Sequence, residues 1–211
     1  MKYTEKLWSP EIINRQRFFD SVAGIWEQEH TESQDTTKLL SLIRRFNLQP
    51  GQAVLDGGCG TGRLVPFILR DIGPAGRLVA VDISENMLAI ARQKYSAPNL
   101  LFLQADVATL KITSYFDRLI CFCLLPHLPD KLPALKAFWR YLKSDGQLIV
   151  AHSSSREEVN AYHAHLPEPI CYDQLPDHQR MMELMRAAHF KILEFEESDI
   201  YFLRAVPEDK K

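Results

Sequence analysis

Short apolar runs rich in β-branched residues alternate with longer segments of helical spacing, and this alternation limits the possible folds more than any other feature of the chain. The runs are AVLDGG, RLVAVDIS, LLFLQADV, DRLICFC and GQLIVAHS, at 53–58, 77–84, 100–107, 117–123 and 146–153. A β-α-β-α order predicts a parallel sheet that is covered by helices on both faces.

Two further apolar runs, at 191–197 and 200–206, are separated only by Ser198 and Asp199. A gap this short permits a hairpin but no helical crossover, so we expect these two strands to be antiparallel. The sequence therefore predicts an α/β fold with a Rossmann-like, seven-stranded sheet. The sheet is expected to be mostly parallel, with an antiparallel last strand and helices on both faces.

The region before the first strand is expected to be helical. Ser9 followed by Pro10 is typical of a helix N-terminus, and apolar residues follow at helical intervals. A second helix is expected to begin near Asp35 and to end before Gln49-Pro50-Gly51. We therefore divide the chain into N-terminal helices at 1–48, which cover the active site, and an α/β domain at 49–211.

The segment from Ser153 to Pro176 differs from the other connections. It is polar, contains three prolines and is longer than a simple crossover. It follows the fifth strand and therefore begins at the sheet edge where open α/β proteins bind ligands. We predict that this segment is an insert that caps the site.

Charge and cysteine content exclude several classes of protein. Lys and Arg number 25 against 27 Asp and Glu, a net charge of −2, so there is no overall positive field to bind a nucleic acid. The longest uncharged apolar stretch, 119–129, is about half the length that spans a bilayer, and the first residues lack the apolar core of a secretory signal. Four cysteines without a regular spacing do not predict a disulfide framework. We expect a cytoplasmic protein with no integral membrane segment and no nucleic-acid partner.

The glycine-rich stretch VLDGGCGTG at 54–62 predicts a ligand site. Glycines after a strand let the backbone approach a ligand and aim helix N-terminal amides at it. A phosphate-binding P-loop needs Lys and Ser or Thr after its last glycine, whereas Arg63 and Leu64 follow Gly62. A dinucleotide fingerprint that starts at Gly58 and Gly60 needs a third glycine where Arg63 stands. Neither motif fits in its strict form.

Acidic residues at three successive strand ends indicate which ligand this turn binds. Asp56 would repel a pyrophosphate, whereas it would attract an ammonium or a sulfonium. Asp82 is placed to accept hydrogen bonds from two ribose hydroxyls, and Asp106 from the exocyclic amine of adenine. S-adenosylmethionine carries an ammonium and a sulfonium and has no phosphate, so these residues favour it as the ligand.

The order of VLDGGCGTG, VDIS, QADV, FDRLICFCLLPHLPD and LKSDGQLIV resembles the class I S-adenosylmethionine-dependent methyltransferases, over about residues 40–206. The resemblance implies that the glycines line the methionine side, Asp82 binds the ribose, Met87 packs on adenine and Cys121 lies near the sulfonium. The implied cofactor-binding residues are Asp56, Gly57, Gly58, Gly60, Gly62, Asp82, Ile83, Met87, Asp106, Val107 and Cys121. Gly57 departs from the family pattern, in which a larger apolar residue is more common.

The segments FFDSVAGIW and LLPHLPD are similar to those of small-molecule and quinone-type methyltransferases of ubiquinone and menaquinone biosynthesis. This similarity implies methyl transfer to a small molecule, with S-adenosylhomocysteine as product, and leaves the acceptor atom open among O, C, N and S. If the acceptor must lose a proton, a side chain whose pKa lies near neutral pH could accept it. The candidate catalytic residues are His127, His152, Tyr162 and His163.

The acceptor is expected to lie between the N-terminal helices, with Phe18, Phe19 and Trp26, and the cap at 153–176. We predict that the cap is a mobile lid that brings Tyr162 or His163 to the acceptor. His163 and His165 form an H-x-H pair, but no strong zinc signature surrounds them, so we expect no metal.

Two alternatives stay open at this point. A methyltransferase-like module could hold the cofactor without turnover and act through a protein partner. A nucleotide-dependent oxidoreductase is disfavoured by Asp56 and by the missing third glycine. The oligomeric state is expected to be a monomer or a homodimer.

Overall fold

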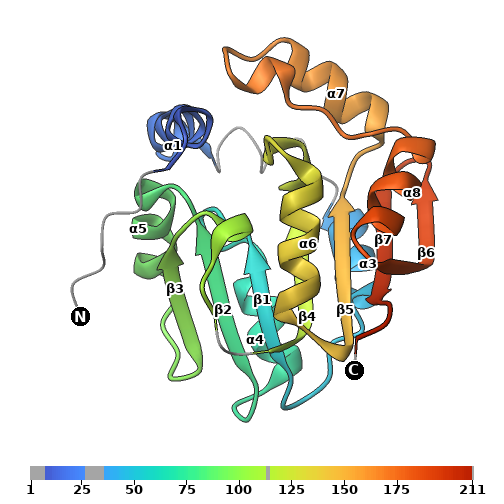
Figure 1. The fold of residues 1–211 in the computed structure, drawn as a ribbon. Coiled ribbons are helices and arrows are strands. Elements are labelled where there is room, and N and C mark those ends of the chain that lie inside the picture. The colour runs from blue at the N-terminus through green and yellow to red at the C-terminus, as the bar shows by residue number, and fades with distance from the viewer. Residues whose placement is uncertain (1–7, 27–35, 113–114, 211) are drawn as a thin grey trace.

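The computed structural model of the chain describes residues 8–26, 36–112 and 115–210. These residues form a seven-stranded sheet with the order β3-β2-β1-β4-β5-β7-β6 (Figure 1). The strands are β1 Ala53–Gly57, β2 Arg77–Asp82, β3 Leu100–Gln104, β4 Phe116–Phe122, β5 Leu142–His152, β6 Phe190–Glu197 and β7 Tyr201–Pro207.

The first five strands are parallel, and β7 is antiparallel to both of its neighbours, β5 and β6. The predicted Rossmann-like sheet with an antiparallel last strand is thus confirmed. From β1 the sheet extends through β2 to β3 on one side and through β4 to β5 on the other. This reversal of strand order opens a crevice at the carboxyl ends of β1 and β4, where open α/β sheets bind ligands.

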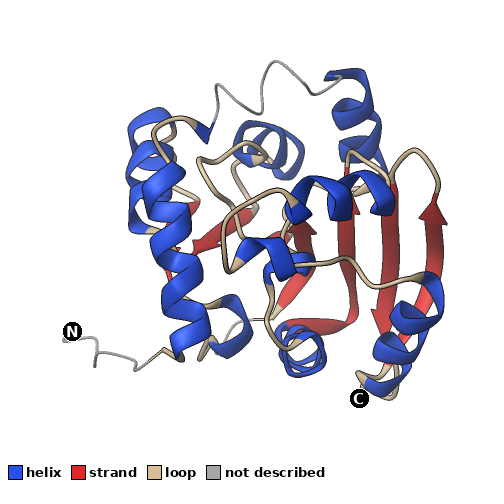
Figure 2. Cartoon of the chain, turned by 90° about the horizontal axis from the view of Figure 1, so that it is seen from above, coloured by secondary structure: helices blue, strands red, loops and turns tan. Residues whose placement is uncertain are grey.

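Helices cover both faces of the sheet, as Figure 2 shows from above. On one face, α3 Thr36–Arg45 and α4 Val65–Ile72 pack buried side chains such as Leu42 and Ile68 against strand residues Val54 and Leu78. On the other face, α6 Lys131–Tyr141 and α8 His178–Ala187 pack around Phe138 and Met181. The helix α5 Glu85–Lys94 lies against β2 and β3. Burial on both faces explains why the central strands are almost continuously apolar.

Two helices, α1 Pro10–Val22 and α7 Arg156–Ala164, lie above the carboxyl ends of the parallel strands (Figure 1). The Ser9 side chain caps α1 by accepting a hydrogen bond from the Ile12 amide, as the Ser-Pro start predicts. Ser155 and Glu158 form a reciprocal capping box that begins α7. Both helices therefore have N-termini that are fixed by their own local sequence.

Two local features differ from the sequence-based expectation or refine it. The helix expected to begin near Asp35 is α3 Thr36–Arg45, while Asp35 itself lies outside the described residues; the helix ends at Arg45 because Asn47 has a left-handed φ of 48°. The cap at 153–176 contains α7 and the short 3₁₀ helix η3 Ile170–Tyr172, and Asn160 bonds both backbone groups of Leu175. Among the described helices, none is long and apolar enough to cross a membrane.

Candidate active site

A cavity of about 600 Å³ opens above the carboxyl ends of β1, β2 and β4. Its size is within the range typical of small-molecule sites. One side consists of the glycine turn and strand ends, and the other of side chains from α1 and from the loop after β4. The wall includes Ile12, Phe19, Trp26, Gly58, Gly60, Phe67, Asp82, Ile83, Met87, Asp106, Val107, Phe122, Cys123 and His127.

The glycine turn requires glycine at two positions. Gly58 and Gly62 have φ values of 70° and 86°, and an added Cβ would lie 2.9 Å from Leu124 Cδ1 at Gly58 and 2.9 Å from Tyr95 Cδ2 at Gly62. The amide of Gly58 donates to the Val81 carbonyl at 2.8 Å, which attaches the turn to β2. Side chains at these positions would meet both steric and backbone strain, so glycine lets the turn close against its neighbours.

Asp82 lies in the cavity wall, and both of its carboxylate oxygens accept backbone hydrogen bonds. Oδ2 accepts from the Gly60 amide at 2.8 Å and Oδ1 from the Ser84 amide at 2.9 Å. Each oxygen has a second lone pair, so the carboxylate can still accept two ligand hydroxyls. Burial raises the pKa of Asp82 to about 6, although the backbone hydrogen bonds oppose that rise.

Asp56, at the end of β1, is only 1% exposed, and among the described residues its Oδ2 has no hydrogen-bond partner. Burial and the charge of Asp82 raise the pKa of Asp56 to about 8. A buried carboxyl oxygen without a hydrogen-bond partner, beside a second acidic group, is energetically costly. The pair therefore fits a cationic ligand such as S-adenosylmethionine, whose positive charges would favour the ionised carboxylates.

Asp106 completes the row of carboxylates at the strand ends. Its Oδ1 accepts from the Ala108 amide at 2.9 Å and caps the 3₁₀ helix η1 Val107–Thr109. In the described part of the chain, Oδ2 of Asp106 makes no further hydrogen bond. This oxygen is therefore available to a donor such as an adenine amine.

The structure places most, but not all, of the implied cofactor residues in the cavity wall. Those in the wall are Gly58, Gly60, Asp82, Ile83, Met87, Asp106 and Val107. Asp56, Gly57, Gly62 and Cys121 lie behind it, and burial raises the pKa of the Cys121 thiol, which keeps the thiol neutral. Cys123 lines the cavity in place of Cys121. The individual roles of these residues remain predictions.

His127 is the candidate catalytic residue that reaches the cavity. It ends the 3₁₀ helix η2 Leu125–His127, and its ring packs edge-on against Phe19 with centroids 5.1 Å apart. Its Nδ1 lies 2.8 Å from Oδ2 of Asp173. Among the described residues, this Nδ1 contact is the one hydrogen bond of the ring. The ring thus has one nitrogen anchored in the protein and one available to a ligand.

The other three catalytic candidates do not line this cavity. His152 is 3% exposed, and burial, together with His127 and His163, lowers its pKa to about 3. His163 is also buried, with Nδ1 2.6 Å from the Asp173 carbonyl oxygen. Tyr162 is 49% exposed and lines a separate hollow between α1 and the end of α7, together with Phe18 and Leu166. In this arrangement none of the three contacts the cavity that contains Asp82, and their catalytic roles remain untested predictions.

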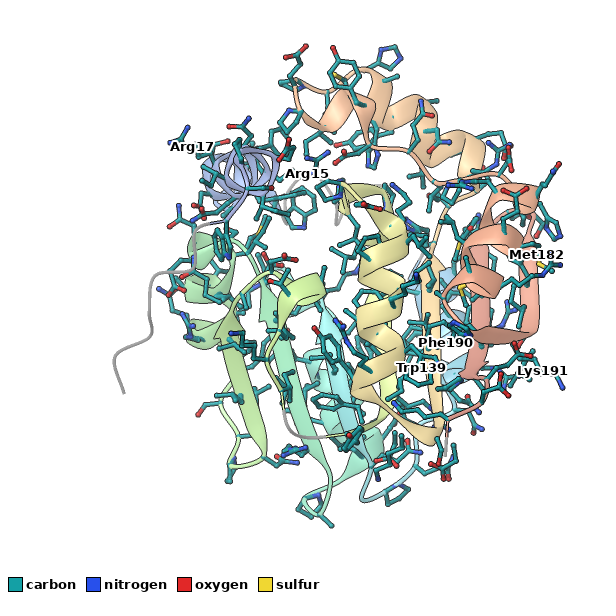
Figure 3. The ribbon with its side chains drawn as sticks, viewed as in Figure 1. Arg15, Arg17, Trp139, Met182, Phe190 and Lys191 are labelled. Atoms are coloured by element: carbon teal, nitrogen blue, oxygen red, sulfur yellow. The ribbon has the colours of Figure 1, made fainter. Side chains whose placement is uncertain are left out.

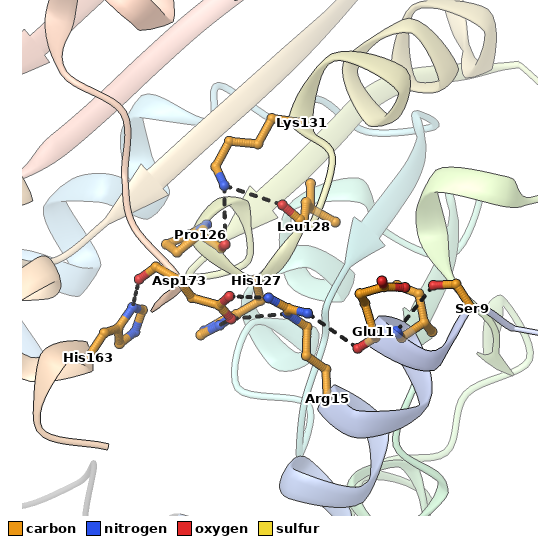
Figure 4. Close-up of polar contacts among 10 residues, drawn as sticks. Ser9, Glu11, Arg15, Pro126, His127, Leu128, Lys131, His163 and Asp173 are labelled. Carbon is orange, nitrogen blue, oxygen red and sulfur yellow. Dashed lines mark hydrogen bonds and ion pairs between the residues drawn. The ribbon is translucent and has the colours of Figure 1, made fainter. Parts of the chain in front are cut away.

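Sequence analysis missed Arg15 and Asp173, which form a buried ion pair beside His127 (Figure 4). The two residues are 158 positions apart, and each lies in a polar stretch that is typical of a solvated surface. No local pattern therefore reveals the pair. Within residues 8–26, 36–112 and 115–210, no group of three or more His, Cys, Asp or Glu side chains could hold a metal.

Helix α1 is also bonded to the cofactor side of the cavity, through Asp20. Its Oδ1 accepts from Ser84 Oγ at 2.6 Å and from the Asn86 amide at 3.2 Å. The Asn86 side-chain amide donates to the Asp20 carbonyl at 3.0 Å. Because Ser84, two residues after Asp82, caps α5, these bonds attach α1 to the strand end that bears the proposed ribose acceptor.

Comparison with known proteins agrees with this geometry. The family model described as a methyltransferase domain matches residues 54–146. A ubiquinone/menaquinone biosynthesis C-methyltransferase of Vibrio campbellii is 36% identical over 124 residues, which cover 54% of this chain and 48% of that protein. The chain thus spans about half the length of several curated relatives that it matches. The Edwardsiella ictaluri protein of the same name is 31% identical over 182 residues, which cover 71% of this chain and 72% of that protein.

Two solved structures share the fold. A methyltransferase in complex with the Haloferax volcanii Trm112 methyltransferase activator superposes with a TM-score of 0.76 at 20% identity, covering 90% of this chain and 97% of that one. Magnesium protoporphyrin IX methyltransferase of Synechocystis, solved with bound S-adenosylmethionine, gives 0.68 at 17% identity, covering 96% and 100%. The shared fold and the extended match to the Edwardsiella protein agree, and the chain belongs to the class I S-adenosylmethionine-dependent methyltransferases.

Proposed function

We propose that this chain transfers the methyl group of S-adenosylmethionine to a small-molecule acceptor inside the cavity. S-adenosylmethionine supplies an electrophilic methyl group on a sulfonium and leaves as S-adenosylhomocysteine. The cavity volume of about 600 Å³ and the overall negative charge support a small acceptor rather than a polyanion. The names of the relatives, which are methyltransferases of quinone biosynthesis, support the same class.

The strand ends hold the cofactor in this proposal. Asp82 accepts hydrogen bonds from the ribose hydroxyls, and Asp106 accepts one from the adenine amine, beside Met87. The buried carboxyl group of Asp56 provides negative charge for the positive end of the ligand. The protein's main contribution to an in-line displacement is to align the reactants and exclude water.

The observation that carries the proposal is the placement of His127 in the same cavity wall as Asp82. His127 accepts the proton of an acceptor hydroxyl or of an acidic ring carbon at Nε2, because Nδ1 is bonded to Asp173. Phe19, Trp26 and Phe122 provide aromatic surface in the same cavity, which suits a flat ring. We therefore propose a ring that bears an ionisable hydroxyl as the acceptor.

The experiment is a methyl-transfer screen with S-adenosylmethionine against hydroxylated rings, catechols, thiols and small acids. S-adenosylhomocysteine and the methylated product are both quantified by mass spectrometry. We expect turnover with a hydroxylated ring and a loss of about 10²- to 10⁴-fold in kcat for His127→Gln. His165→Gln, which changes an exposed histidine of the cap, is the control and should leave kcat unchanged.

Calorimetry with S-adenosylmethionine completes the experiment, because it separates binding from turnover. The His127→Gln variant should bind the cofactor as tightly as the original protein. Tight cofactor binding without turnover on any acceptor would contradict the proposal and favour the alternative, a cofactor-binding module that acts through a protein partner.

A further inference from the structure

We infer that Asp173 and Arg15 are positioning residues for His127, and that together they hold its imidazole in the tautomer whose unprotonated Nε2 is available to the cavity. The catalytic consequence of this inference rests on the proposed function. Its structural content does not, because the tautomer of a histidine can be measured without turnover.

Three segments that are distant in sequence converge at this cluster (Figure 4). Arg15 comes from α1, His127 from η2 and Asp173 from the residue directly after η3. Arg15 Nε donates to Asp173 Oδ2 at 3.2 Å, and its second guanidinium nitrogen bonds Oδ1. The side chains of Arg15, Asp173 and His127 are 9%, 2% and 11% exposed. The carboxylate is therefore held from one side by Arg15 and presented to His127 on the other.

The chemistry of the carboxylate determines the tautomer. An ionised carboxylate only accepts hydrogen bonds, so the Nδ1 that lies 2.8 Å from Asp173 Oδ2 has to donate. A neutral imidazole with its proton on Nδ1 has an unprotonated Nε2, which is the atom that can take a proton. Arg15 keeps Asp173 in its accepting form, because a bidentate guanidinium stabilises the negative charge. Burial raises the pKa of Asp173, but the hydrogen bonds from His127 and Arg15 outweigh it and hold that pKa below its usual range.

A second histidine, His163, packs against the ring of His127. The two ring centroids are 4.8 Å apart, and His163 Nδ1 lies 2.6 Å from the backbone carbonyl oxygen of Asp173 rather than from its carboxylate. Burial and the neighbouring His127 lower the pKa of His163, so His163 stays neutral near pH 7. The Asp173 carboxylate is hydrogen-bonded to His127, whereas His163 contacts only the backbone carbonyl of that residue. The titratable and charged groups around His127 are Arg15, Asp173, His163, His152 and Lys131.

If Arg15 and Asp173 formed a purely structural ion pair between α1 and the cap, a different result would be expected. Such a pair would stabilise the fold without any effect on the protonation of His127. Asp173 Oδ2, however, accepts from both Arg15 Nε and His127 Nδ1, so a change at either side alters the partner of the imidazole.

The first experiment measures the histidine tautomer by ¹⁵N NMR of the side chain in the original protein, with His127→Gln used to assign the signal. The expected neutral form is protonated at Nδ1. In Asp173→Asn, Arg15 needs the remaining oxygen, so the amide nitrogen donates to Nδ1 and the neutral form becomes protonated at Nε2. A protonated Nε2 in the neutral ring of the original protein would overturn the inference, whether or not the Asn variant folds.

The second experiment measures kcat, KM and their pH dependence on the best acceptor of the screen. Asp173→Asn should lose about 10²- to 10⁴-fold in kcat with little change in KM. Arg15→Gln should shift the acidic limb of the kcat profile to higher pH, because Asp173 loses its counter-charge, and Arg15→Lys should restore part of the original profile. Arg17→Gln is the matched control, since Arg17 extends from another side of α1 and is exposed (Figure 3).

The two sets of results distinguish this inference from the proposed function. If His127→Gln loses turnover while a folded Asp173→Asn keeps both kcat and the Nδ1 proton, the proposed function stands and the positioning role is wrong. If the tautomer responds as expected but no acceptor is methylated, the positioning role stands and the proposed function is wrong.

Discussion

The two sides of the cavity are built in different ways. The cofactor side consists of a backbone turn and the ends of neighbouring strands, and its carboxyl groups Asp56 and Asp82 have raised pKa values because the effect of burial outweighs that of hydrogen bonds. On the acceptor side, side chains from distant segments meet, and its carboxylate, Asp173, is fully paired within the protein. The difference indicates that the first side needs its ligand to balance its charges, whereas the second is complete without one.

The largest effect is expected where the ligand replaces missing partners. Asp82→Ala removes the proposed acceptor of both ribose hydroxyls and should weaken S-adenosylmethionine binding by roughly 1.5 to 3 kcal/mol, about 10- to 150-fold in Kd. Calorimetry checks this, with the exposed Asp145→Ala as control and NAD as a ligand that should not compete. Unchanged affinity in a folded Asp82→Ala variant would show that the ribose does not bind at this strand end.

The next prediction concerns movement on the acceptor side. We propose that the segment from Ser153 to Pro176 opens and closes as a lid, whose Asp173 contacts the cavity residue His127. Amide exchange there should be faster than in β1 and β4 in the free protein, and about tenfold slower with S-adenosylhomocysteine plus acceptor. Exchange that is already as slow as in these strands would show that the segment belongs to the rigid core.

A smaller effect is expected when Asp56 is replaced, because its buried carboxyl group lowers the stability of the folded protein at high pH. Its folded pKa of about 8 exceeds the unfolded value near 3.8, so the folded protein binds more protons and loses stability as pH rises from about 4 to 8. Asp56→Asn cannot titrate, so its stability advantage over the original should grow between pH 5 and pH 9. A growth of roughly 1 kcal/mol would raise the difference in Tm by about 2 to 4 °C. The same difference in Tm at both pH values would argue against this cost.

Chelation of metal ions is expected to have no effect on the rate of methyl transfer. Methyl transfer from a sulfonium needs no Lewis acid, and the proposed proton acceptor is a histidine. Dialysis against EDTA should leave the initial rate unchanged. Loss of turnover that added zinc or magnesium restores would contradict the prediction.

The fold and the cofactor side were accessible from sequence because their signals are local. The five apolar runs predict strands with ends within a few residues of the observed ones, and the two-residue gap after 197 predicts the hairpin. The glycine stretch predicts the turn because Gly58 and Gly62 adopt backbone angles that other residues rarely reach. Cys121 shows the limit, since the cavity is lined by Cys123 two residues later.

The acceptor side could not be predicted in the same way. Arg15 and Asp173 become neighbours only when α1 and the cap pack over the sheet, and no periodicity records a contact across 158 residues. Histidines were recognised as candidates by residue type, but type does not show that His152 is buried whereas His127 faces the cavity. That distinction depends on the turn after β4, where the 3₁₀ helix η2 places His127 at the edge of the sheet.

The hydrogen bonds of Asp20 have a consequence for protein engineering. They connect α1 to Ser84 and Asn86, so the position of this helix over the cavity is fixed at defined points. A library that seeks new acceptors can vary Ile12 and Phe19, which face the cavity, while it keeps Asp20 constant. Acceptor preference can then be redesigned without displacing the helix, because the bonds of Asp20 hold it to the cofactor side and the varied residues do not take part in them.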